Sequence, residues 1–204
     1  MARQKAEAKI VKLVLIKEGS FHISVTKDKY GNDVNDVTIE YPIMIIGAGQ
    51  DKTIIHGGLK IQGKNEEKKR VDMQGMTMKG SKRQGLYAEN GLSFLCKDMT
   101  FTQCVSIGVA AVNTKGRLIN CVITQCEWSG ISCHQNALIE LEGDQTKVDG
   151  NVTSGYYGGY GLKTYNTSST IHLLFPLTKE SVSTNNQGGG NYGGTGTIET
   201  VKSF

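Results

Sequence analysis

The stretch Gly85-Leu86-Tyr87-Ala88-Glu89-Asn90 decides the fold, because it returns as Gly108-Val109-Ala110-Ala111-Val112-Asn113 and again as Gly130-Ile131-Ser132-Cys133-His134-Gln135-Asn136. The starting glycines lie 23 and 22 residues apart. A fourth copy begins at Gly161, and an earlier one begins at Gly58. A repeat of this length is typical of a solenoid, in which stacked coils share one continuous core.

The repeat also carries an alternation. In each copy the second and fourth residues are almost all small or apolar, whereas the third and fifth vary. Successive side chains of a β-strand point to opposite faces, so this pattern predicts a strand with one buried side. The predicted inward pairs are Leu86/Ala88, Val109/Ala111, Ile131/Cys133 and Leu162/Thr164.

Two further strands can be aligned in each coil. One is predicted at 76–78, 99–101 and 122–124, again 23 residues apart, and the other lies around 92–95, 118–119 and 138–141. Three short strands in about 23 residues predict a triangular coil. The 26 glycines, against two prolines, predict tight turns between these strands.

Polar residues recur at the predicted corners. Asn90, Asn113 and Asn136 lie 23 residues apart, and the tripeptides 102–104 and 124–126 both read Thr-Gln-Cys. Asparagine tolerates left-handed backbone, and its amide can bond to the amide of the next coil. These residues predict side-chain ladders along the corners.

The Gly-Ile-x-x-x-Asn phrase, the corner asparagines and the segment 39–55 resemble the right-handed parallel β-helix repeat family, the pectate-lyase-like solenoids, over roughly residues 11–175. Segments 171–180 and 185–194 are similar to uncharacterised stand-alone β-helix proteins of algae and protists. The first family includes lyases, epimerases, phage tailspikes and substrate-recognition modules, so the resemblance specifies fold better than function.

The expected fold is therefore all-β, a single-stranded right-handed parallel β-helix of about seven coils with three short strands in each. Residues 1–204 are expected to form one domain, with a possible N-terminal cap at 1–10, coils at 11–175 and a C-terminal cap or tail at 176–204.

Composition favours a soluble intracellular protein. No run approaches the roughly 18 apolar residues of a membrane span, and the N-terminus lacks a signal-peptide pattern. The net charge of +4 includes the mixed run 64–70, which is typical of a solvated loop. With 7% aromatic residues and no basic aromatic stripe, neither nucleic acid nor membrane is an expected partner.

Metal and cofactor motifs are weak. Gly47-Ala48-Gly49 lacks the third glycine and the helix of a dinucleotide site, so no cofactor is expected. The cysteines lack paired CxxC spacing and are interpreted as reduced, small hydrophobic residues. His22, His56 and His172 are isolated in the sequence. The five cysteines are Cys96, Cys104, Cys121, Cys126 and Cys133.

The outward residues of the glycine-headed strands form two predicted rows. Only Glu89 on these rows could bind calcium, which disfavours calcium-dependent chemistry and predicts no metal. The tyrosines of the insertion before Gly161 either stack on a ligand or cover the last coil. The predicted binding face comprises Lys60, Gln62, Tyr87, Glu89 and Ser132, with Tyr156, Tyr157 and Tyr160 in the insertion.

Two functions remain open. The leading one is a non-catalytic binding or structural module for a protein or polysaccharide partner, because the repeat lacks a convergent acid, base and metal set. The alternative is a metal-independent uronate lyase or epimerase. In that case His134 and Tyr165 would transfer protons while Lys163 neutralises the substrate carboxylate, with strand spacing placing them about 5 Å apart.

Overall fold

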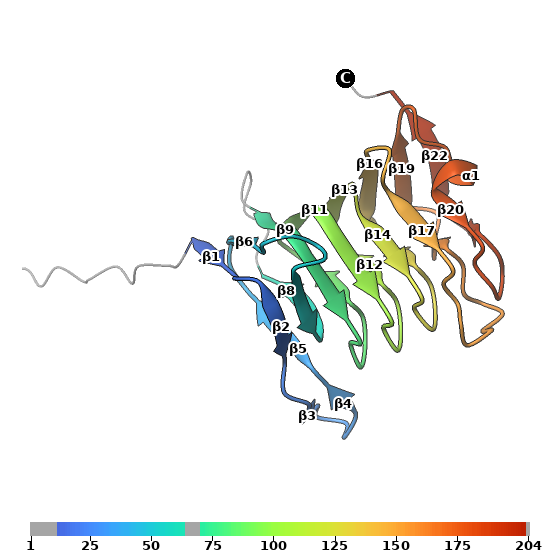
Figure 1. Cartoon of the computed structure of the whole chain (residues 1–204). Coiled ribbons are helices and arrows are strands. Elements are labelled where there is room, and N and C mark those ends of the chain that lie inside the picture. Colours follow the sequence, from blue (N-terminus) through green and yellow to red (C-terminus); the bar gives the residue numbers. More distant parts are fainter. Residues whose placement is uncertain (1–11, 64–69, 203–204) are drawn as a thin grey trace, which may run out of the picture.

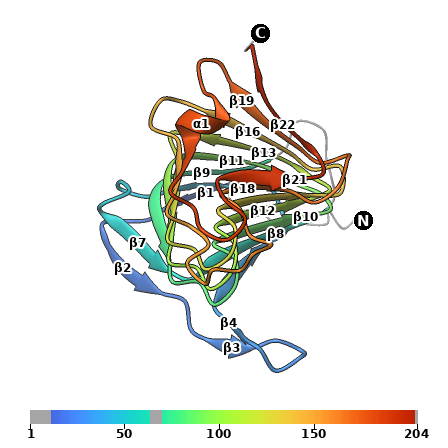
Figure 2. The same cartoon turned by 90° about the vertical axis from the view of Figure 1, so that its right-hand side faces the viewer.

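The chain folds into parallel strands that stack coil upon coil (Figure 1). The computed structural model describes residues 12–63 and 70–202. Viewed along the stack, the strands line three sides of the molecule, here called faces A, B and C (Figure 2). The prediction of an all-β fold built from parallel strands is confirmed.

Face C is a seven-stranded sheet that contains the glycine-headed strands. Leu86 pairs with Val109, and Val109 pairs with Ile131, so each of these steps advances by one repeat of the sequence. The step from Ile131 to its partner Leu162 is longer, because an insertion precedes this strand. In chain order the strands are β5 (Asp36–Ile39), β8 (Gly58–Gln62), β10 (Leu86–Glu89), β12 (Val109–Val112), β15 (Ile131–His134), β18 (Leu162–Thr164) and β21 (Tyr192–Gly194).

Face A contains β1 (Leu13–Leu15), β6 (Met44–Ile46), the first halves of β9 (Arg70–Lys79) and β11 (Ser93–Thr102), and then β13 (Lys115–Ile119), β16 (Leu138–Glu142), β19 (Thr170–Leu174) and β22 (Thr197–Val201). Face B contains β2 (Gly19–His22), β7 (Thr53–His56), the second halves of β9 and β11, and then β14 (Val122–Thr124), β17 (Lys147–Asp149) and β20 (Ser183–Thr184).

Strands β9 and β11 differ from the predicted pattern of three short strands. Each runs without interruption and serves both face A and face B. The backbone turns within them at Gly75, with φ 67°, and at Asp98, with φ 49°. A single left-handed residue turns the chain without ending the strand. The structure therefore has one long strand where the sequence pattern predicts two short ones.

The corner after face C contains part of the predicted amide ladder. Asn90 and Asn113 have φ of 46° and 50°, and the Asn113 amide donates to Asn90 Oδ1 at 3.2 Å. The prediction for Asn136 is wrong by one residue. Val112 pairs with His134, so Gln135, with φ 43°, takes the corner position. At the corner before face C, Gln103 donates to Gln125 at 3.1 Å, as the shared tripeptide predicts.

The glycines that head the repeats do not form the tight turns that the sequence predicts. None of them has positive φ. A methyl group at Gly108 would lie 2.3 Å from Cγ2 of Ile123 and 2.8 Å from the carbonyl oxygen of Gly130. Close approach of the next coil therefore excludes a side chain at these positions. The same crowding occurs at Gly58, Gly85, Gly130 and Gly161.

The inward side chains of the three faces form one core. All five cysteines are buried in it as free thiols. Burial raises the pKa of Cys121 to about 12, so this thiol stays protonated and unreactive at neutral pH. The interpretation of the cysteines as small hydrophobic residues agrees with this placement.

The two ends of the stack differ. Residues from 176 onward, for which the sequence predicts a cap or tail, add a short helix α1 (Lys179–Val182) and then one more strand to each face. The predicted cap at 1–10 lies outside the described residues. Near the N-terminal end, the antiparallel hairpin β3 (Thr26–Lys27) and β4 (Asp33–Val34) projects from the stack (Figure 1).

Candidate functional site

The outward side chains of face C form the two predicted columns. Pairing of the strands places Lys60 beside Tyr87, and Ser132 beside Lys163. Neighbouring strands in a sheet lie about 4.8 Å apart, so each column is a line of closely spaced side chains. The first column contains Lys60, Tyr87, Ala110, Ser132 and Lys163, and the second contains Gln62, Glu89, Val112, His134 and Tyr165.

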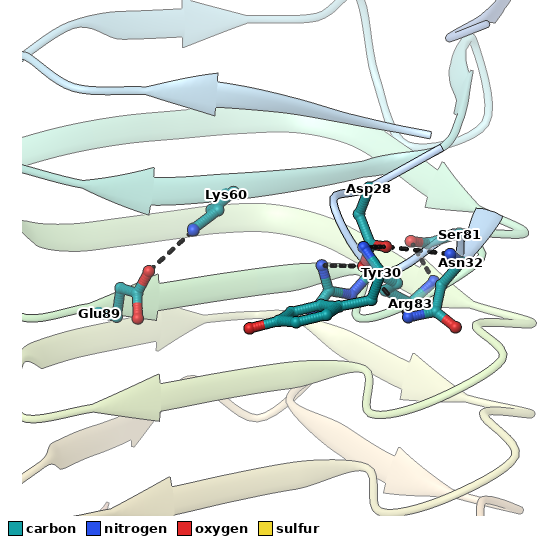
Figure 3. A network of polar contacts seen from close by, with 7 residues as sticks. All are labelled: Asp28, Tyr30, Asn32, Lys60, Ser81, Arg83 and Glu89. Atoms are coloured by element: carbon teal, nitrogen blue, oxygen red, sulfur yellow. Dashed lines mark hydrogen bonds and ion pairs between the residues drawn. The ribbon is translucent and has the colours of Figure 1, made fainter. Parts of the chain in front are cut away.

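The N-terminal half of face C is a network of paired polar groups. Lys60 Nζ lies 2.8 Å from Glu89 Oε1 (Figure 3). The Tyr87 hydroxyl donates to Glu89 Oε2 at 3.1 Å. Burial and the Glu89 carboxylate together raise the pKa of Tyr87 to about 12. Gln62 Nε2 donates to Glu40 at 2.8 Å. Beside these groups lies a hollow of about 480 Å³ lined by Glu40, Gln62, Gly63, Glu89 and Asn90.

The β3–β4 hairpin flanks this network. Asp28 accepts hydrogen bonds from the backbone N–H groups of Tyr30 and Asn32, at 2.8 and 3.0 Å, and lies 4.0 Å from Arg83 (Figure 3). These bonds hold the pKa of Asp28 below its usual value. The Tyr30 side chain is 76% exposed. The sequence marks this segment only as a polar turn, because its partner Arg83 is distant in the chain.

The middle of face C separates two halves. Ala110 is buried and Val112 is partly buried, so neither offers a polar group to a ligand. The sequence also places these two apolar residues in the middle of the columns.

Three side chains proposed for catalysis come together in the C-terminal half. The His134 and Tyr165 rings stack with centroids 3.9 Å apart and an interplanar angle of 18°. Lys163 Nζ lies 3.9 Å from the Tyr165 centroid and 6.0 Å from that of Tyr160. The Ser132 hydroxyl lies 2.8 Å from His134 Nε2. Thus His134, Tyr165 and Lys163 meet, with Ser132 beneath them.

Lys163, Ser132 and Nε2 of His134 already have hydrogen-bond partners. Lys163 is buried, and its ammonium group donates to the backbone carbonyl of Gly158. Ser132 is also buried, so its hydroxyl does not reach solvent. Burial, with a smaller contribution from the Lys163 charge, lowers the pKa of His134. The imidazole is therefore neutral at pH 7. A neutral imidazole can accept a proton, but Nε2 of this one already bonds to Ser132.

We expect His134 to make stability depend on pH. Because its pKa is lower in the folded chain than the usual 6.5, the unfolded chain binds more protons below pH 6.5. The free energy of unfolding should therefore fall as the pH drops from 6.5 through the lowered pKa. In urea titrations at several pH values, His134→Asn should show a weaker fall than the unchanged chain. Equal falls would contradict this expectation.

The insertion before β18 carries exposed aromatic rings. Tyr156 and Trp128 stack with centroids 5.4 Å apart, and they are 51% and 45% exposed. Tyr157 is 85% exposed. The Ser154 N–H donates to the Glu127 carbonyl at 3.2 Å, which ties the insertion to the loop that carries Trp128. The rings of Trp128 and Tyr156 therefore form one surface, and the exposed Tyr157 follows directly in the chain. These three residues are here called the aromatic platform.

Tyr160 lies apart from the aromatic platform. A methyl group at Gly193 would lie 2.4 Å from its ring, and one at Gly189 would lie 2.5 Å from it. The ring thus covers two glycines of the last coil and also approaches Lys163. Tyr160 therefore packs on the coil, as one of the two predictions has it, whereas Tyr156 and Tyr157 are exposed, and the stacking of these two rings on a ligand stays a prediction.

The histidines described as isolated in the sequence are not isolated in the structure. His22 and His56 pair across β2 and β7, and their rings stack with centroids 4.2 Å apart. His172 Nε2 lies 3.6 Å from Glu199. The separation of His22 and His56 along the chain is longer than the repeat period, so the repeat could not reveal their contact.

Among residues 12–63 and 70–202, no three His, Cys, Asp or Glu side chains are grouped so that they could hold a metal ion. The same residues contain no helix that is long and apolar enough to cross a membrane. Comparisons of the chain with protein-family models, with curated proteins and with solved structures find no match.

Proposed function

We propose that this chain is a non-catalytic glycan-binding module that holds a sugar chain against the aromatic platform. The observation that carries this proposal is the insertion before β18. It makes one coil longer than the two before it, places Tyr156 against Trp128, and exposes Tyr157 at the next position. In solenoid proteins, insertions into single repeats often form the binding surface.

The chemistry of the platform favours a sugar ring as its ligand. Tyrosine and tryptophan offer flat apolar rings that can stack on the apolar face of a pyranose, and each has a polar group at its edge. Tyr165, which is exposed above His134 on face C, could extend this surface. The paired groups Lys60, Gln62 and Glu89 farther along face C could exchange hydrogen bonds with hydroxyl groups of a longer chain.

The fold that we propose for this module is a right-handed parallel β-helix of the pectate-lyase-like kind. Strands in the same sheet follow one another in parallel through crossover connections, and such connections are right-handed in about 98% of cases. The coil spacing and the corner residues Asn90 and Asn113 support the same assignment.

A uronate lyase or epimerase is the second candidate function. The meeting of His134, Tyr165 and Lys163 favours it, since a base and a cation must lie near one sugar unit. This function would require Lys163 to leave the Gly158 carbonyl and turn toward a substrate carboxylate. Binding alone requires no such rearrangement, so we place it first.

The test is calorimetric titration of the chain with neutral and uronate oligosaccharides. Tyr157→Ala and Trp128→Ala should each weaken binding about fivefold or more, since loss of roughly 1 kcal/mol of stacking corresponds to that factor. Phe175→Ala is the matched control, because Phe175 is exposed on the loop after β19, away from the platform residues.

Three outcomes would overturn the proposal. One is the absence of binding to every glycan tested. Another is equal affinity of the Tyr157 and Trp128 variants and the unchanged chain. The third is the release of unsaturated uronate products, which would favour the lyase, provided that His134→Asn abolishes the release and Phe175→Ala does not.

A further inference from the structure

A line of contacts joins face C to the aromatic platform. Lys163, on β18, donates from its ammonium group to the carbonyl of Gly158 in the insertion. The Tyr156 ring packs directly on Gly158, since a methyl group at this glycine would lie 2.9 Å from Cε1 of Tyr156. Tyr156 in turn stacks on Trp128. The residue that Lys163 holds is therefore the one on which a ring of the platform rests.

The insertion depends on Lys163 for its shape near this ring. Its ends are fixed at Ser154 and Gly159, which form backbone hydrogen bonds with other coils. Among the described hydrogen bonds, that of Lys163 is the one that reaches residues 155–158 from outside the insertion. Three of residues 155–159 are glycines, whose backbone has the greatest conformational freedom. Loss of this one bond therefore frees the segment that supports Tyr156.

His134 and Lys163 are neighbours around the Tyr165 ring. The centroid of the His134 ring and the ammonium nitrogen of Lys163 each lie 3.9 Å from the centroid of Tyr165. Burial, and after it the charge of Lys163, lowers the pKa of His134. Coupling between two groups is reciprocal, so a proton on His134 weakens the placement of the Lys163 ammonium group by the same free energy. Protonation of His134 thus acts against the bond to Gly158.

Lys163 is the one charge that acts on His134 among the described residues. Glu89 stands on the same column but two strands away. Histidine is the side chain whose charge ordinarily changes between about pH 8 and pH 5, so His134 is the group here that responds to mild acid. The groups that face it are Val112 from β12, Lys163 from β18, Tyr165 directly after β18, and Ser132 from its own strand.

We propose that Lys163 is a positioning residue of the aromatic platform and that protonation of His134 releases it, so that the platform holds a glycan at neutral pH and binds it more weakly in acid. This inference rests on the proposed function of the platform. At neutral pH, Lys163 bonds to Gly158 and Tyr156 is held against Trp128. In acid, the imidazolium repels the ammonium group, Lys163 leaves the carbonyl, and the stack loses its support.

The fluorescence of Trp128 tests this switch without a ligand, because Trp128 is the one tryptophan of the chain and stacks on Tyr156. Emission should change between about pH 7.5 and pH 5 with a one-proton midpoint below 6.5, and at the acid end it should approach that of Tyr156→Ala. The ring protons of His134 should titrate with the same midpoint in NMR spectra. A flat emission profile would overturn the proposal, as would a change that coincides with loss of the β-sheet signal in circular dichroism.

Variants separate the roles of the two residues. His134→Asn removes the titration, so its emission should stay at the neutral-pH value throughout. Lys163→Met removes the bond to the insertion, so its emission at neutral pH should already match the acid state. Lys163→Arg keeps the charge and the donors, and should restore the dependence on pH. His172→Asn, the same substitution at a histidine of face A, is the matched control and should behave as the unchanged chain.

The midpoint of His134 distinguishes positioning by charge from a merely structural role. In Lys163→Met this midpoint should rise toward 6.5, because the charge that helps to lower it is gone. A purely structural effect of the substitution would not move it. An unmoved midpoint would overturn the proposal, as would an acid transition that persists in His134→Asn.

Glycan affinity completes the test. The unchanged chain should bind about fivefold more weakly in acid than at neutral pH, the factor expected for loss of one stacked ring, whereas His134→Asn should bind equally at both. Emission that switches in a chain that binds no glycan would contradict the proposed function and leave the switch in place. Equal binding at both pH values, with flat emission, would overturn the switch and leave the glycan-binding function standing.

Discussion

Replacing Gly116 by valine is expected to lower the free energy of unfolding by about 3 kcal/mol, at the upper end of the usual cost of overpacking. Gly116 pairs with Phe94 in the preceding coil, and both lie on the inner side of face A. A methyl group at Gly116 would lie 2.1 Å from Cζ of Phe94. The fully buried phenyl ring thus occupies the space that a side chain at position 116 would need.

A double variant provides the control for this prediction. Phe94→Val alone should cost about 2–4 kcal/mol, because it leaves a cavity beside Gly116. Combined with Gly116→Val, it should cost clearly less than the sum of the two changes, by about 2 kcal/mol, since one new side chain fills the space vacated by the other. Chemical denaturation of the four chains measures this coupling. Simple additivity would show that the two positions do not share volume.

Replacing Asn151 by leucine is expected to cost about 2–4 kcal/mol, because several buried polar groups would lose their partners. The Asn151 side chain is fully buried. Its Oδ1 accepts from the Cys126 N–H at 3.1 Å, and its Nδ2 donates to the Ile123 carbonyl at 2.9 Å. It therefore joins two coils from inside the stack.

Asn151→Asp separates hydrogen bonding from shape. A buried carboxylate can accept from Cys126, but it cannot donate to the Ile123 carbonyl, and burial without a cation should raise its pKa in the folded chain. The folded state would then bind more protons than the unfolded state, so the stability of this variant should rise as pH falls. Asn136→Asp, the same substitution at an exposed asparagine, should show neither effect. Equal stability of Asn151→Asp at pH 7 and at acid pH would contradict this interpretation.

The columns of face C could be predicted because they depend on local periodicities. The alternation within each strand separates Tyr87 from Leu86, and the nearly constant coil length brings Tyr87 beside Ala110. Where coil length changes, prediction from the period fails by one residue, as at Asn136, or misses a contact altogether, as between His22 and His56.

The candidate sites were predictable only in part. Composition and spacing selected His134, Tyr165 and Lys163, and the structure brings them together. The bond from Lys163 to the Gly158 carbonyl depends on how the insertion folds back, which involves no repeated pattern. Likewise, the stacking of Trp128 on Tyr156 joins two loops of different length.

The sequence by itself determined the class of fold, the inward half of each repeat and the columns of face C, because strand periodicity and coil length are properties of neighbouring residues and of a regular repeat. Only the tertiary structure decided which side chains remain available. It engages Lys163, exposes Tyr157 and leaves β1 with a free edge among the described strands. Whether a side chain or a strand edge is free to bind depends on its neighbours in the adjacent coil or at the end of the stack. Packing in space decides which residues these neighbours are.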